Sequence, residues 1–120
     1  MAAIQTRPLV QTFPNPITGK ETIITHTMPE HDSFSKECPA LETATLEISY
    51  IPDQTCIEIH SLKEFWVSFQ SQGIWYEHVL SEIYDEIYKI CSPKWLRVTG
   101  EFSTENGIIS KIQIENAKSS

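Results

Sequence analysis

The sequence WLRVTGEFSTENGIISKIQIE, residues 95–115, contains two segments of strand character on either side of an Asn-Gly pair. Trp95 to Phe102 alternates apolar and polar residues, which is typical of a half-buried strand. Asn106 and Gly107 tolerate the positive φ angles of a tight turn, and Ile108 to Glu115 supplies the returning strand. Strands joined by a hairpin are antiparallel, so this stretch predicts an antiparallel sheet.

Two further strands are predicted nearer the N-terminus. Glu21 to Thr27 is rich in β-branched residues, and Pro29 is expected to end this strand. Thr43 to Ile51 places apolar residues on one face and polar residues on the other, and Pro52 closes it.

Between these pairs of strands the apolar spacing changes to that of helices. Ser61 and Glu64 form a capping box, which predicts a helix from Ser61 to about Gln72, ended by Gly73. A second, longer helix stops at Ser92-Pro93, and its apolar stripe consists of Val79, Leu80, Ile83, Ile87 and Ile90.

The predicted order is therefore ββααββ, an α+β fold with a four-stranded antiparallel sheet and two helices on one face. Residues 1–20 contain three prolines and predict an extended N-terminal arm. Residues 21–116 are expected to form a single domain, and residues 117–120 a frayed tail. A sheet with one uncovered face and two edges gains from association, so a homo-oligomer is expected.

Composition narrows the class of protein. A chain of 120 residues supports one hydrophobic core, and no apolar run approaches the length that spans a bilayer. The N-terminus lacks the pattern of a secretory signal, which favours a cytoplasmic location. A net charge of -7 disfavours direct binding of nucleic acid. Three widely spaced cysteines indicate free thiols, with no disulfide framework and no metal site.

Two short segments carry a family resemblance. Residues 48–53, ISYIPD, and residues 58–63, EIHSLK, resemble segments of the QueF family of nitrile reductases, within a similarity that covers roughly residues 28–110. The resemblance implies the tunnelling fold (T-fold). It also implies reduction of the nitrile of 7-cyano-7-deazaguanine to an aminomethyl group in queuosine biosynthesis, with NADPH as the cofactor.

The resemblance assigns binding roles to several residues. Glu77 and Glu58 would hold the deazapurine base, because a carboxylate accepts paired hydrogen bonds from the adjacent N–H donors of a guanine-like ring. Tyr76 stands beside Glu77 where the family has a histidine. Ser61, Lys63 and His60 fall in the family's cofactor signature, although His60 replaces a lysine and Ile59 a serine there.

The nucleophile has two candidate positions. The family forms a thioimide between a cysteine and the nitrile carbon, and an acid protonates the nitrogen. An alignment with a three-residue deletion assigns these roles to Cys38 and Glu42. A gapless alignment puts Ser35 in place of the cysteine, and a serine needs a partnered base to attack.

Two other functions remain open. The departures at Ile59, His60 and Tyr76 are compatible with changed chemistry on the same base or on a pterin, resembling an amidinotransferase or GTP cyclohydrolase I. They are also compatible with a non-catalytic module that binds a purine or pterin or serves in assembly. In the family, active sites lie at subunit interfaces.

Overall fold

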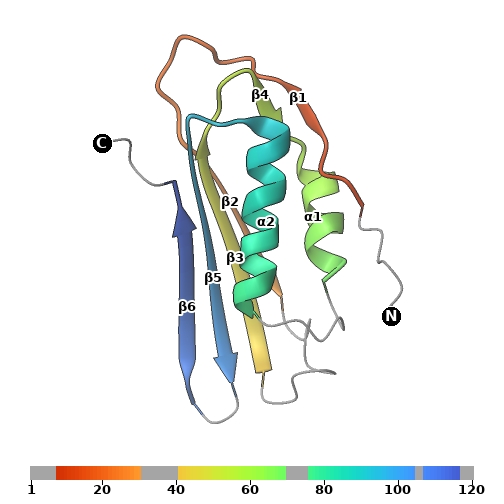
Figure 1. The fold of residues 1–120 in the computed structure, drawn as a ribbon, viewed down its shortest axis with the longest axis vertical. Helices are drawn as coiled ribbons and strands as arrows, with labels where there is room; N and C mark the ends of the chain where they lie inside the picture. The colour runs from red at the N-terminus through yellow and green to blue at the C-terminus, as the bar shows by residue number, and fades with distance from the viewer. Residues whose placement is uncertain (1–7, 31–40, 70–75, 105–106, 117–120) are drawn as a thin grey trace.

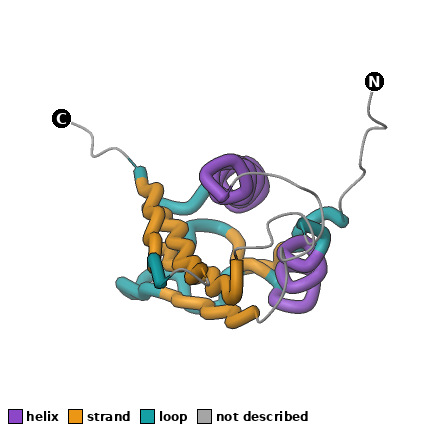
Figure 2. Tube along the Cα trace, turned by 90° about the horizontal axis from the view of Figure 1, so that it is seen from below, coloured by secondary structure: helices purple, strands orange, loops and turns teal. Residues whose placement is uncertain are grey.

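The computed structural model describes residues 8–30, 41–69, 76–104 and 107–116. Its main sheet has the antiparallel order β2-β3-β5-β6, and both α1 and α2 lie on one face of it (Figures 1 and 2). The predicted fold class is confirmed. The bounds of these elements are β2 Ile24–Glu30, β3 Leu41–Ile51, α1 Ile59–Val67, α2 Tyr76–Cys91, β5 Trp95–Thr104 and β6 Ile109–Glu115.

Two short strands that the sequence did not predict form a second sheet. Strand β1, Thr12–Pro14, pairs antiparallel with β4, Thr55–Ile57. Val10, two residues before β1, is 4% exposed and belongs to the hydrophobic core. The described part of the N-terminal arm is therefore packed against the residues that lead into α1. Residues 117–120, predicted as a tail, lie outside the described residues.

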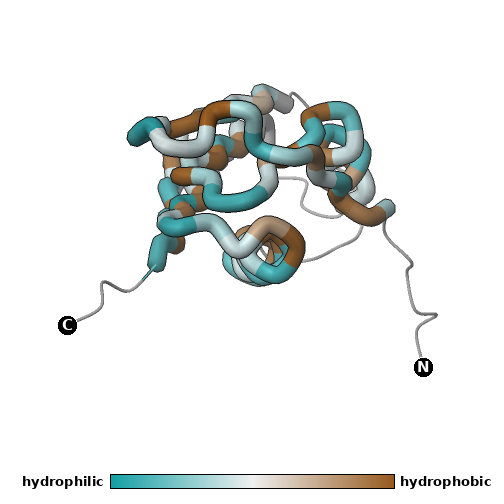
Figure 3. Tube along the Cα trace, turned by 90° about the horizontal axis from the view of Figure 1, so that it is seen from above, coloured by the Kyte–Doolittle hydropathy of each residue, from teal (hydrophilic) through white to brown (hydrophobic). Residues whose placement is uncertain are grey.

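The core lies between the sheet and the helices. One side of β3 is completely buried, as its alternating pattern predicts, through Ala44, Leu46, Ile48 and Tyr50. The apolar stripe of α2, made of Val79, Leu80, Ile83 and Ile87, is buried in the same core and lies against β5 and β6. Figure 3 shows hydrophobic and hydrophilic segments side by side on α2, as expected of a helix with one buried face. No helix among the described residues is long and apolar enough to cross a bilayer.

Three predicted boundaries are wrong for identifiable reasons. Pro29 does not end its strand, because β2 runs to Glu30 along the edge of the sheet, where a missing N–H costs no ladder bond. Helix α1 begins at Ile59 and not at Ser61, because Glu58 is its N-cap residue. The same helix ends at Val67 with Ser68 as its C-cap, short of Gln72. The predicted terminator Gly73 lies outside the described residues.

Candidate functional site

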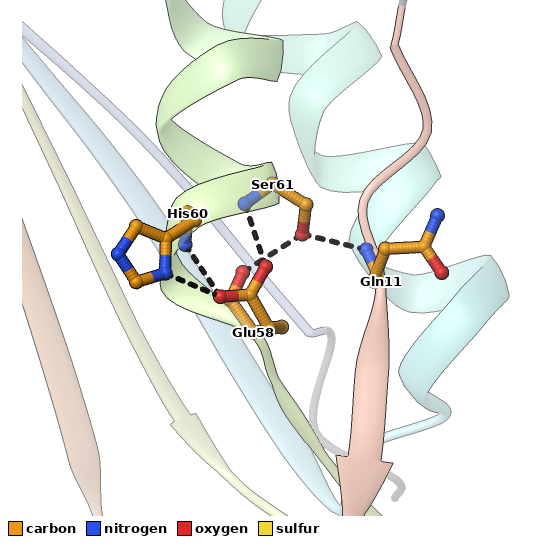
Figure 4. Close-up of polar contacts among 4 residues, drawn as sticks. All are labelled: Gln11, Glu58, His60 and Ser61. Atoms are coloured by element: carbon orange, nitrogen blue, oxygen red, sulfur yellow. Dashed lines mark hydrogen bonds and ion pairs between the residues drawn. The ribbon is translucent and has the colours of Figure 1, made fainter.

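The first turn of α1 is organised by the carboxylate of Glu58. Its Oε1 accepts a hydrogen bond from the backbone N–H of Ser61 at 2.8 Å, and its Oε2 accepts one from the backbone N–H of His60 at 2.9 Å. Nδ1 of His60 lies 2.8 Å from the same Oε2 (Figure 4). The backbone donors of His60 and then Ser61, followed by the His60 ring, lower the pKa of Glu58 to about 2. Glu58 is therefore ionised throughout the physiological range.

Ser61 uses its hydroxyl within the fold. The Oγ donates to the backbone oxygen of Glu58 at 2.8 Å and accepts from the backbone N–H of Gln11 at 2.7 Å (Figure 4). The side chain is buried, with 6% of the residue exposed. It fastens the strand that starts after Gln11 to the helix. Ser61 thus holds the first turn in place, and its hydroxyl proton and one of its acceptor positions are used within the fold.

A second link fixes the segment before α1. The phenol oxygen of Tyr50, on β3, accepts a hydrogen bond from the backbone N–H of Ile57 at 2.9 Å. Tyr50 is completely buried, and burial is the main reason why the pKa of its hydroxyl is raised. This bond ties the last residue of β4, directly before Glu58, to the main sheet.

A groove lies between the edge strand β2 and the start of α1. One cavity of about 260 Å³ and another of about 400 Å³ share His26, Ile59 and His60 as lining residues. We call the two together the β2–α1 groove. The smaller cavity is completed by Phe13, Ile24, Tyr50, Cys56, Ile57 and Glu58. The larger is completed by Thr25, Thr27, Met28, Leu62 and Lys63.

Sequence reasoning missed His26. The residue follows Ile24 and precedes Met28 at alternate positions of β2, on the side that faces the helices. The sequence does carry one signal for this residue: a histidine stands between Ile24 and Met28 on a strand face that is otherwise apolar. Its neighbours in the groove, Phe13 and Ile57, lie on the two short strands, which have too few residues to show a periodic pattern.

The other predicted binding residues lie at the far end of the helix layer. Glu77 is exposed in the first turn of α2. The last residue of that helix, Cys91, donates from Sγ to the backbone oxygen of Thr55 at 3.2 Å, close to the start of α1. With a rise of 1.5 Å per residue, Glu77 is roughly 20 Å from that end of α2. Figure 1 shows the two helices starting at opposite ends. One chain does not bring Glu58 and Glu77 together.

The comparisons with known proteins identify the family. A family model described as QueF-like protein matches residues 42–120. The chain belongs to the QueF family. It is 33% identical over 106 residues to the NADPH-dependent 7-cyano-7-deazaguanine reductase of Nitrosococcus oceani, covering 88% of this chain and 82% of the relative. The reductase of the same name from Chlorobaculum tepidum is 27% identical over 113 residues, covering 94% and 97%.

A solved structure supports the fold of this QueF-family chain. The apo form of the archaeosine synthase QueF-Like superimposes with a TM-score of 0.70 at 14% identity, over 84% of this chain and 99% of that one. The T-fold predicted from the sequence is thereby confirmed. At this level of identity the likeness concerns the arrangement of the backbone and not the chemistry of the site.

The predicted catalytic residues of this QueF-family chain are only partly described. Cys38 and Ser35 lie outside the described residues. Glu42 belongs to β3 and Tyr76 begins α2, but the placement of both side chains is likewise outside the description. The choice between Cys38 and Ser35 as nucleophile therefore stays a prediction.

Proposed function

We propose that this QueF-family chain reduces the nitrile of 7-cyano-7-deazaguanine to an aminomethyl group, with NADPH as the reductant. The observation that carries the proposal is its similarity to the reductases, which extends over more than four fifths of both chains. The cavity beside Glu58 agrees with it, because apolar walls and one fixed carboxylate suit a flat, neutral base.

Glu77 is the stronger candidate for gripping the base. Glu58 already accepts three hydrogen bonds within its own chain, whereas Glu77 stands exposed at the start of a helix of sixteen residues. A carboxylate paired with two adjacent N–H donors of the ring gives a charge-assisted, oriented contact. Glu58 then contributes its remaining acceptor capacity and a fixed negative charge.

Within one chain, Glu58 and Glu77 lie at opposite ends of the helix layer. The proposed site is therefore completed by a second copy of the chain. The start of α1 in one subunit would face the start of α2 in its partner, in a homo-oligomer. This proposal makes a specific prediction for mixed oligomers. Glu58→Gln and Glu77→Gln subunits, each weak alone, recover activity when coexpressed, because one interface then carries both wild-type acids.

In the proposed chemistry Cys38 attacks as a thiolate. Its sulfur forms a bond to the nitrile carbon while one C–N π bond breaks, and Glu42 gives its proton to the nitrogen. When bound, NADPH supplies the hydrides that reduce the carbon. Between the two reductions the nitrogen lone pair would expel the sulfur, which breaks the C–S bond and returns the thiolate of Cys38. Ser35 takes the place of Cys38 under the alternative alignment.

The residues of the larger cavity fit a phosphate-bearing cofactor in part. His60 and Lys63 border it and supply basic groups, whereas the hydroxyl of Thr25, also in its lining, lies 2.9 Å from the Oγ of Ser49. Ser61 does not fit, since its hydroxyl is committed to Gln11 and Glu58. His60 and Lys63 would therefore hold the cofactor, and Ser61 would act by positioning the helix that carries them.

Intact-protein mass spectrometry and NADPH absorbance test the proposal together. Incubation with 7-cyano-7-deazaguanine is expected to add the mass of the base, and NADPH is then consumed. The adduct should be lost in Cys38→Ala and kept in Ser35→Ala; the reverse result assigns Ser35. Absence of both the adduct and NADPH consumption overturns the reductase proposal.

A second candidate function keeps the base and changes the reaction. The commitment of Ser61 and the apolar Ile59, 54% exposed at the same turn, weaken the proposed cofactor segment. An adduct that forms while the absorbance of NADPH stays constant would favour this function over reduction.

A further inference from the structure

His26 is a polar residue in a position built for an apolar one. It pairs with Ile48 across β2 and β3 and lies between Ile24 and Met28 on the side that faces the helices. Its Nε2 is buried and has no hydrogen-bond partner in the described part of the chain. An unpartnered buried nitrogen costs stability, so a phenylalanine or leucine would serve packing better at this position.

The environment favours the uncharged imidazole. Burial lowers the pKa of His26 from its ordinary value of 6.5, and its ring lies 6.1 Å from that of Tyr50, centroid to centroid. A neutral imidazole has one donor and one acceptor nitrogen. It can therefore accept a hydrogen bond from the N–H of an amide-like group on a ligand, or donate one to the C=O of that group.

His26 is a polar residue of the smaller cavity whose Nε2 is not engaged within the described part of the chain. The oxygens of Glu58 are held by backbone and imidazole donors, and the Tyr50 hydroxyl is engaged with Ile57. His60, which also lines this cavity, directs its Nδ1 to Glu58. The remaining walls are mainly apolar, contributed by Phe13, Ile24, Ile57 and Ile59.

This lining selects the kind of ligand. A diphosphate would need cations, and the basic residues His60 and Lys63 meet at the larger cavity, not at the smaller one. The smaller cavity suits a flat, uncharged ring with hydrogen-bonding groups on one edge. Among the two molecules of the proposed reaction, the deazapurine base has this character and the dinucleotide does not.

We propose that His26 is a specificity-determining residue that hydrogen-bonds the amide edge of a neutral deazapurine ring seated in the smaller cavity of the β2–α1 groove. The inference rests on the proposed function for the class of ligand. It goes beyond that function by adding a recognition residue from the edge strand.

Calorimetric titration with 7-deazaguanine tests this inference without the nitrile chemistry. His26→Phe keeps the ring and removes both nitrogens, and it is expected to weaken binding at least tenfold. His26→Gln, which retains a donor and an acceptor, should recover part of that loss. Thermal unfolding of His26→Phe should be unchanged or shifted upward, since an unsatisfied polar atom is removed.

The outcomes separate this inference from the proposed reductase function. Equal affinity of wild type and His26→Phe for 7-deazaguanine overturns the role of His26, even if the nitrile adduct still forms. Tenfold weaker binding by His26→Phe supports it, even if NADPH is never consumed. Failure of the wild type to bind 7-deazaguanine overturns it as well. So does a loss confined to NADPH affinity, because the groove would then hold the cofactor.

Discussion

The backbone N–H of Gln11 donates to the hydroxyl of Ser61 across 50 positions of sequence, at 2.7 Å. This bond joins the N-terminal strand to the helix whose first turn carries Glu58 and His60. Gln11 therefore supports the candidate site, because it helps to hold in place the helix turn that carries Glu58 and His60.

Loss of that bond should loosen the first turn of α1. Ser61→Ala leaves a part-buried N–H of Gln11 without its acceptor, and we expect the free energy of unfolding to fall by about 1–2 kcal/mol. Urea denaturation followed by circular dichroism measures this loss. Ser81→Ala, at an exposed position of α2, is the matched control and should change stability by less than about 0.5 kcal/mol.

The depressed pKa of Glu58 predicts a pH-dependent contribution to stability. Since the folded pKa of about 2 lies below the ordinary value of 4.5, the contribution is complete above pH 4.5 and is lost as pH falls toward 2. Glu58→Gln should therefore be less stable than wild type at pH 7, and the difference should shrink at pH 3.

Denaturation curves at pH 7, 4 and 3 check this prediction. Glu64→Gln, an exposed position on the same helix, serves as the control variant. A difference between wild type and Glu58→Gln that stays constant across these pH values would show that the capping carboxylate does not titrate as the hydrogen bonds require.

Gly100 is a close-packing position between β5 and α2. A Cβ atom at this residue would lie 2.8 Å from Cε2 of Phe102 and 2.9 Å from Cδ2 of Leu80, both shorter than ordinary contact. Gly100→Ala should therefore destabilise the fold by roughly 1–3 kcal/mol through overpacking.

A double-mutant cycle isolates the cause. Leu80→Ala alone creates a cavity, but in the Gly100→Ala background it also removes one of the colliding side chains. The double variant should consequently be more stable than the sum of the two single losses predicts. Strict additivity would count against steric conflict with Leu80.

Two of the three thiols should be protected in the folded protein. Cys56 and Cys91 are both buried with 3% exposure, and burial raises the pKa of Cys91, which disfavours its reactive thiolate. Titration with a thiol reagent should label these two only on unfolding. Any rapid labelling then belongs to Cys38, and Cys38→Ala should abolish it; fast modification of Cys56 or Cys91 in the native state contradicts the prediction.

Periodicity in the sequence determined the elements of the fold. The alternation from Thr43 to Ile51 and the stripe from Val79 to Ile90 each correspond to a face that is buried, and the hairpin signal at Gly107 agrees with its φ of 89°. Such patterns arise because one face of a strand or helix must leave water, so they can be recognised without knowledge of the partner.

The sequence also supplied the family and the residues of its signature segments, but not their grouping in space. The capping role of Glu58, the engagement of Ser61 with Gln11 and the separation of Glu58 from Glu77 depend on where distant segments meet. His26 lines the groove because β2 lies beside the start of α1. Hydrogen bonds and cavities are made between segments far apart in the chain, and no local pattern of residues encodes which segments those are.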